Sequence, residues 1–285
     1  MNESPSSDDE TMASSVDVVW LKKDVRLHDH APLSAVCSGS ATRRCIILYL
    51  YEPDQLSQKT VHGSHVEFVN EGLVDLDRRL SGAASRQGAT TDVYDHKFQC
   101  LTVCHANAAW TFRSLHKQHT INRILCHMET GHLKSFSRDK AVRRWCRANN
   151  VPIFEFNQTG VTRCLSDRDD FTKLFHKFLE QPMHPVPTRK QLDCLSERLI
   201  VPNEIHGLCS APLSPVEMEE IPAQHRGDRV ERQRGGETLA LEMLASFLGR
   251  RGANYSQGIS SPNTSWTTGS RLSPYLTWGH VSIRR

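Results

Sequence analysis

Short apolar runs alternate with amphipathic stretches along the first half of the chain. The runs at 16–21 and 45–50 are rich in β-branched and aromatic residues, which is typical of strands buried on both faces. Residues 64–82 carry apolar positions at steps of three and four, so they predict an amphipathic helix. Further strands are predicted at 99–105, 121–127 and 151–156, and further helices at 32–37, 106–119 and 137–149.

This alternation predicts an α/β fold over residues 16–180, with a doubly wound, mostly parallel sheet covered by helices. The preceding residues 1–15 are acidic and serine-rich, and they predict a disordered tail. Residues 181–234 hold seven of the 13 prolines, which indicates an interdomain linker with at most short helical pieces.

A second, helical domain is predicted to start at residue 235. The pattern predicts a helix at 235–250, a loop to residue 270 and another helix over 272–285. Two helices and a loop cannot bury a core of their own, so 235–285 is expected to be the beginning of a truncated helical domain.

Composition excludes several classes of protein. The chain has 285 residues, 38% hydrophobic and 24% charged, and no apolar run approaches the roughly 20 residues of a membrane-spanning helix. Nine cysteines without framework spacing indicate reduced thiols, and no secretory signal is evident, so a cytoplasmic or nuclear location is expected. Beyond the acidic tail, 35 basic residues face 28 acidic ones, a net charge of +7 that permits a polyanionic partner without requiring one.

The most informative segment for chemistry is 264–282. Gly269, Ser270 and Ser273 lie at the entrance of the last predicted helix, where unpaired backbone N–H groups and the helix dipole favour an anion. Arg271 could pair with a phosphate there. The structural alternative is a serine-capped helix with Pro274 in its first turn.

Two charged loops follow predicted strands, where doubly wound sheets bind ligands. In the first loop, 22–30, Asp24 and Arg26 are a candidate local ion pair, and Asp29 is expected to cap the next helix. The second loop contains His127 and Glu129. No histidine or cysteine pair has metal-site spacing, so no metal is predicted. The motifs G-x-G-x-x-G, G-x-x-x-x-G-K-[ST] and G-x-S-x-G are absent.

Taken together, the segments WLKKDVRLHDH (20–30), GGETLALEMLASFLGRRGANY (235–255) and GSRLSPYLTWGHVS (269–282) strongly resemble the photolyase/cryptochrome family. The resemblance covers about residues 16–285. It implies an α/β antenna domain followed by an all-helical domain that binds FAD.

The resemblance also implies particular site residues. The FAD phosphates would be held by the turn containing Ser270, Arg271, Leu272 and Ser273, with Tyr255 upstream, although its spacing from the turn is longer than in many members. Gly269 stands where many members have threonine, which removes one hydroxyl donor. A second, antenna chromophore of folate or deazaflavin type would contact the loops at 22–26 and 127–129, with Glu129 as the named candidate.

The implied activity is that of a light-dependent DNA photolyase, in which excited reduced FAD gives an electron to a pyrimidine dimer flipped out of damaged DNA. The alternative within the family is a cryptochrome-type blue-light photoreceptor without repair activity. An alternative from another class is a stand-alone α/β nucleotide-binding or scaffold module. The protein is expected to be a monomer, no catalytic residue is assigned, and the truncated chain is expected to hold FAD poorly.

Overall fold

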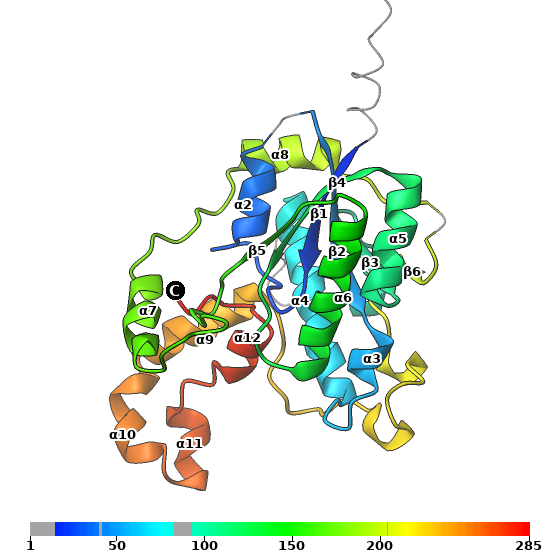
Figure 1. The fold of residues 1–285 in the computed structure, drawn as a ribbon. Coiled ribbons are helices and arrows are strands. Elements are labelled where there is room, and N and C mark those ends of the chain that lie inside the picture. Colours follow the sequence, from blue (N-terminus) through cyan, green and yellow to red (C-terminus); the bar gives the residue numbers. More distant parts are fainter. Residues whose placement is uncertain (1–14, 40–41, 83–92, 204) are drawn as a thin grey trace, which may run out of the picture.

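A six-stranded sheet organises the first part of the molecule. The computed structural model describes residues 15–39, 42–82, 93–203 and 205–285, so the predicted tail lies almost entirely outside the described residues. The strand order is β5-β4-β1-β2-β3-β6, and all neighbours are parallel except β6, which is antiparallel to β3 (Figure 1). The strands are β1 (Val16–Leu21), β2 (Arg44–Tyr51), β3 (Leu101–His105), β4 (Ile121–His127), β5 (Ile153–Phe156) and β6 (Leu208–Cys209).

Helices cover both faces of this sheet, which confirms the predicted doubly wound architecture. One face packs on α2 (Ala31–Cys37), α4 (Gly63–Ser81) and α8 (Arg189–Arg198), and the other on α5 (Ala108–Gln118) and α6 (Leu133–Ala148). The strands are buried on both sides because their residues alternate between two separate apolar cores. In β1, for example, Val19 enters the first core and Trp20 the second, where its ring meets Phe112 edge-on at 5.1 Å.

The predicted helix over 64–82 is α4, and its ends have clear local causes. The side chain of His62 accepts a hydrogen bond from the first turn, and Gly82 ends the helix with a φ of 72°. Helix α6 starts four residues before the prediction because the side chain of His132 caps it by accepting from the backbone N–H of Lys134.

The segment between the sheet and the last helices runs over the surface of the α/β core. It contains α7 (Asp170–Leu179) and α8, the edge strand β6, and the 3-10 turns η2 (Pro215–Glu217) and η3 (Ala223–His225). The short elements α3 (Pro53–Leu56) and η1 (Val93–Asp95) lie earlier in the chain.

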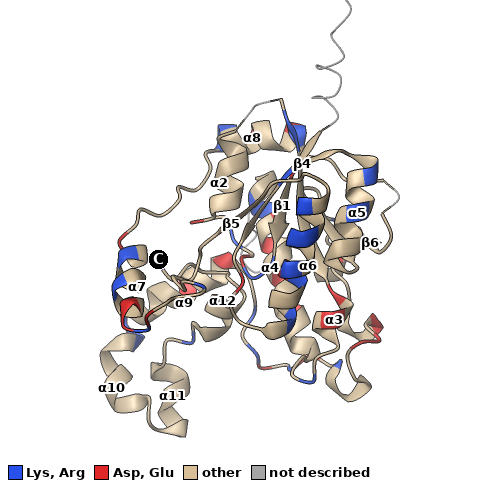
Figure 2. Cartoon of the chain, in the orientation of Figure 1, with Lys and Arg blue, Asp and Glu red and all other residues tan. Residues whose placement is uncertain are grey.

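The C-terminal part consists of short helices beneath the carboxyl edge of the sheet (Figure 1). They are α9 (Glu237–Gly249), η4 (Arg251–Asn254), α10 (Tyr255–Gly258), α11 (Pro262–Thr268) and α12 (Ser273–Thr277). α10 and α11 carry no charged residue (Figure 2). None of the described helices is both long and apolar enough to cross a membrane.

Two predictions for this part are wrong. The expected loop to residue 270 contains α10 and α11. The expected helix over 272–285 ends at Thr277, because Gly279 turns the chain with a φ of 69° and the N–H of His280 bonds back to the carbonyl of Tyr275 at 2.8 Å. The chain then runs along the first loop of the α/β domain instead of continuing as a helix.

Candidate functional site at the carboxyl edge of the sheet

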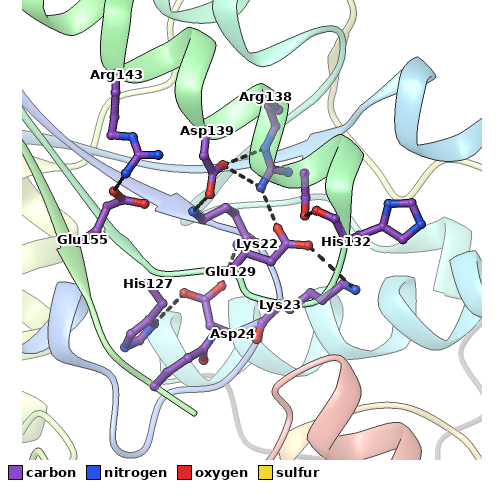
Figure 3. Close-up of polar contacts among 12 residues, drawn as sticks. Lys22, Lys23, Asp24, His127, Glu129, His132, Arg138, Asp139, Arg143 and Glu155 are labelled. Atoms are coloured by element: carbon purple, nitrogen blue, oxygen red, sulfur yellow. Dashed lines mark hydrogen bonds and ion pairs between the residues drawn. The ribbon is translucent and has the colours of Figure 1, made fainter. Parts of the chain in front are cut away.

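The polar residues that follow β1 and β4 meet at the carboxyl edge of the sheet. From β1 the chain builds β2 and β3 on one side, and β4 and β5 lie on the other, so the strand order reverses between β1 and β4. Such a switch point is where doubly wound sheets bind ligands. Lys22 and Asp24 follow β1, while His127 and Glu129 belong to the end of β4, and they lie together in Figure 3.

Asp24 forms a buried cluster with two histidines. Its Oδ2 lies 2.7 Å from Nδ1 of His127 and 3.2 Å from Nε2 of His30, in poorer alignment. Burial raises the pKa of Asp24, but hydrogen bonds from the two histidines outweigh burial and hold this pKa well below its ordinary value. Burial lowers the pKa of His127 to about 3. Burial also lowers the pKa of His30, so at neutral pH the cluster is one carboxylate next to two neutral imidazoles.

Among the described residues, the ligand atoms of Asp24, His30 and His127 also lie close enough to share a metal ion, within 4.8 Å of one another. Nδ1 of His30 accepts a hydrogen bond from the N–H of Leu33 at 3.1 Å, which directs its remaining N–H toward Asp24. Nδ1 of His127 bonds Asp24 at 2.7 Å, whereas Nε2 of His30 is buried without a hydrogen bond of good geometry. The absence of a metal stays a prediction.

Arg138 of α6 gathers three carboxylates around one guanidinium, and Figure 3 shows two of them, Glu129 and Asp139. Its nitrogens lie 2.7 Å from Glu52, 2.6 Å from Glu129 and 2.9 Å from Asp139. Burial lowers the pKa of Arg138, but the three carboxylates outweigh burial and raise this pKa. Lys22 supplies a second cation, with Nζ 3.3 Å from Asp139. The two charged loops singled out in the sequence are therefore joined in one buried network.

A cavity of about 350 Å³ opens beside this network. Tyr49, Val69 and Trp278 contribute apolar surface, and Glu129 and Arg138 contribute polar groups. This mixture of an apolar wall with a few fixed polar groups suits a small organic ligand. The structure places Glu129, the predicted antenna contact, in the wall of this cavity with only 7% of its surface exposed.

The first loop also fastens the helical part to the sheet. Arg26 is 2% exposed and donates to the carbonyls of His28 at 3.1 Å and of Gly279 at 3.0 Å. Glu237, the first residue of α9, lies 2.8 Å from Nδ1 of His28. Nε2 of the same histidine accepts from the backbone N–H of Ser282 at 3.1 Å. His28 therefore bridges the two ends of the C-terminal part.

Two expectations for this loop are not met. Asp24 and Arg26 do not form an ion pair, because the carboxylate takes the histidines and the guanidinium takes backbone carbonyls. Asp29 does not cap α2; His30 does. Asp29 instead adopts a φ of 45° and accepts a hydrogen bond from Nε of Arg284 at 3.0 Å. Its partner lies at the far end of the chain, where no local pattern could indicate it.

The turn between α11 and α12 presents free hydrogen-bond donors. Among the described residues, the backbone N–H groups of Ser270, Arg271 and Ser273 have no partner. The hydroxyl of Ser270 accepts only a long hydrogen bond, 3.5 Å, from the N–H of Leu272, and Ser273 is exposed at the start of α12. Free amides and hydroxyls in one turn are a donor set that fits a diphosphate.

The side chain of Arg271 points away from the entrance of α12. Its backbone has a φ of 59°, its Nε donates to Oε1 of Gln233 at 3.2 Å, and its guanidinium lies over the ring of Trp266, 3.1 Å from the centroid. Arg271 therefore offers its backbone amide to the turn and its side chain to the linker.

Tyr255 and Gly269 complete the predicted set. Tyr255 begins α10, is 41% exposed and packs edge-on against Phe247 at 5.9 Å. Gly269 follows α11, and its carbonyl and that of Ser270 both accept from Arg251. Sequence reasoning missed Arg251, since nothing but its position after α9 marks it. The FAD role of all these residues stays a prediction.

The fold defines a doubly wound α/β domain with a helical segment docked at the carboxyl edge of its sheet. The family model described as DNA photolyase matches residues 17–190, more than half of the chain. The chain belongs to the DNA photolyase family.

Individual relatives agree with this assignment. The chain is 25% identical to Cryptochrome-1 of Rattus norvegicus and 22% identical to Cryptochrome-1 of Drosophila melanogaster; it aligns over 94% of its own length, but over 44% and 50% of theirs. Its fold is similar to a cryptochrome of Synechocystis (TM-score 0.67, 21% identity, 100% of this chain and 55% of that one). It is also similar to a photolyase of Sulfolobus tokodaii solved with two FAD molecules (TM-score 0.62, 19% identity, 94% and 53%). The chain thus spans about half the length of these proteins.

Proposed function

We propose that this chain provides the α/β domain and the beginning of the FAD-binding domain of a light-dependent DNA photolyase. The observation that carries the proposal is the turn 269–273, whose free amides and hydroxyls lie on a helical segment clamped to a photolyase-family domain. Bound, reduced FAD would supply the electron that splits a pyrimidine dimer in damaged DNA after light is absorbed.

The residues of this chain would bind and orient that cofactor. The amides of Ser270, Arg271 and Ser273 would donate to its phosphates, and the hydroxyl of Tyr255, a residue that is 41% exposed, would do the same. Arg251 would position the turn through the two carbonyls it already binds, those of Gly269 and Ser270.

The surface of α9 supports a helical domain larger than residues 235–285. Apolar residues occur all around this helix, yet only Glu237 and Ala240 are buried, while Leu239 is 37% and Leu248 73% exposed. Helices that are apolar all round are normally buried. We infer that further helices cover α9 in the functional protein, and that residues 1–285 alone hold FAD weakly.

The 350 Å³ cavity is the proposed site of an antenna chromophore. Glu129 and Arg138 would fix the polar groups of the chromophore, and Tyr49 and Trp278 would contact its rings. Folate and deazaflavin types both remain compatible with this lining.

A photoreceptor without repair activity is the second candidate, since the curated relatives named above are cryptochromes. The test uses the longest natural form of the protein, reduced and illuminated with blue light in the presence of an oligonucleotide containing a thymine dimer. Light-dependent loss of the dimer supports the photolyase, whereas bound flavin without repair supports the photoreceptor. A protein that never carries flavin overturns both and favours the stand-alone α/β module.

A matched pair of variants tests the turn itself. Ser270→Ala with Ser273→Ala is expected to lower flavin content, because two hydroxyl donors are lost beside the free amides. Ser137→Ala, an exposed serine on α6 without a hydrogen-bond partner for its side chain among the described residues, is the control. Equal flavin content in the natural protein, the double variant and the control would exclude the two hydroxyls as phosphate donors.

A further inference from the structure

A second and larger cavity, of about 670 Å³, adjoins the proposed antenna cavity and is bordered by Arg271 of the proposed FAD turn. It is bounded by the start of α4, by the linker and by the segment around α11 and α12. The lining residues that matter here are Lys59, His62, Arg229, Trp266, Arg271 and Trp278.

Three of these residues are cations that lack a carboxylate partner. Among the described residues, no ion pair involves Lys59, Arg229 or Arg271. Arg232, which also lines the cavity, differs because Glu71 holds it at 2.8 Å. The lining also contains one exposed carboxylate, that of Glu231, which the three unpaired cations outnumber. Such an excess of positive charge on one concave surface attracts anions and raises their local concentration.

Arg271 is directed into this cavity by a backbone conformation that is unusual for a residue with a side chain. Its φ of 59° is in the left-handed region, which disfavours side chains other than those of glycine, asparagine and aspartate. Gln233 holds Arg271 by two hydrogen bonds. Oε1 of Gln233 accepts from Nε of Arg271, and Nε2 of Gln233 donates to the carbonyl of Arg271 at 2.9 Å. The guanidinium is therefore fixed against Trp266, with further N–H donors available for an oxyanion.

Neutral donors and aromatic surface complete the lining. Nδ1 of His62 accepts from the N–H of Ser64 at 3.2 Å, so its Nε2–H is the ring donor in the neutral form. Trp266 is 60% exposed, and Trp278 is partly buried. Both indole rings border the same space as the unpaired cations, which provides a surface for stacking a planar ring.

We propose that this cavity binds a nucleotide, that is, a ligand combining phosphate groups with a planar aromatic ring. Lys59, Arg229 and the guanidinium of Arg271 would bind the phosphates, and Trp266 and Trp278 would contact the ring. The site is separate from the turn proposed for FAD, which uses the amides on the other side of Arg271. It adjoins the antenna cavity, with which it shares the lining residues Thr60, Val61, His65 and Trp278.

The test measures binding of ADP to the chain by isothermal titration calorimetry, at low and at high salt. The double variant Lys59→Gln, Arg229→Gln is expected to weaken binding at least tenfold, because two phosphate partners are lost. Lys117→Gln with Arg113→Gln is the matched control, since both side chains are exposed on α5, outside the cavity. The substituted residues are exposed, so folding should be unaffected, and circular dichroism checks this.

Four results would overturn the proposal, three from ADP and the variants and one from a comparison of ligands. The first is no binding of ADP at millimolar concentration, and the second is equal weakening by the control variant. The third is that Ser270→Ala loses ADP binding while the double variant at Lys59 and Arg229 keeps it, which would place ADP at the FAD turn instead. Binding of inorganic pyrophosphate and of adenosine, measured in the same way, tests the phosphate part and the ring part of the ligand separately. ADP binding tighter than either supports a nucleotide, whereas pyrophosphate binding as tightly as ADP would overturn it.

Discussion

Replacement of Gly279 by alanine should separate the helical part from the α/β domain. The residue has a φ of 69°, and a Cβ atom there would lie 2.1 Å from the carbonyl oxygen of Lys23 and 2.6 Å from Cα of Asp24. Ordinary van der Waals contact begins at 3.4 Å, so the backbone of the first loop would have to retreat by about 1.3 Å. It is not free to do so, because the carbonyl of Lys23 also accepts a hydrogen bond from Gln158 at 3.1 Å.

Two costs add up in this variant. The left-handed conformation costs an alanine about 1–2 kcal/mol, and overpacking against fixed backbone costs about 1–3 kcal/mol more. We therefore expect the free energy that docks residues 235–285 on the sheet to fall by about 2–5 kcal/mol. Urea unfolding followed by tryptophan fluorescence would show an earlier transition, and limited proteolysis would cut near α9 first.

Gly249→Ala is the control for this experiment. Gly249 is the last residue of α9, and a Cβ atom there would meet nothing within 4 Å. Alanine favours a helix over glycine by up to about 1 kcal/mol, so this variant should be as stable as the natural chain or slightly more stable. If Gly279→Ala unfolded at the same urea concentration as Gly249→Ala, the described contact with the first loop would be refuted.

Three further predictions concern buried polar groups. Burial lowers the pKa of His280 to about 3, so the contribution of the neutral imidazole to the free energy of unfolding should be fully present above pH 6.5 and decline as the pH falls toward 3. In urea titrations at a series of pH values, His280→Gln should flatten this decline by up to about 1.4 kcal/mol per pH unit. An unchanged slope would contradict the assignment. Arg138→Met leaves three buried carboxylates without their shared cation and should cost about 3–5 kcal/mol of unfolding free energy, measured by urea denaturation; a loss below 1 kcal/mol would show that water reaches the network. Glu237→Gln should expose α9 to protease by weakening the contact with His28, whereas Glu242→Gln, exposed on the same helix, should not; equal cleavage would refute the tether.

The predicted helices and strands agree best with the structure where residues close in sequence determine the local conformation. The strands at 16–21 and 121–127 and the helix at 64–82 follow from burial and periodicity alone, and the structure confirms them within one residue. Parallel strands separated by helices imply that their carboxyl ends share one edge, so the meeting of the two charged loops was also foreseeable.

The predictions failed where the partner is remote in sequence. Arg26 binds the carbonyl of Gly279, 253 residues away, and Asp29 binds Arg284, 255 residues away. The sequence pattern predicted a nearby carboxylate as the partner of Arg26 and the next helix as the partner of Asp29, because such a pattern reports only on residues close in sequence. The error at α12 has another cause: Gly279 is a local helix-stop signal that the prediction overlooked, and the turn it makes docks the chain on the first loop.

The sequence by itself determined the fold class and the family resemblance, and it singled out the turn at 269–273 as a candidate site. Those features depend on side-chain type and short spacing, which the chain displays directly. The tertiary structure alone decided which charges remain unpaired, that Arg271 turns toward the linker, and that His28 joins the sheet to the helical part. Pairing of charges and hydrogen bonds over long separations depends on which surfaces the folded chain brings into contact, and that is a property of the packed molecule rather than of any segment.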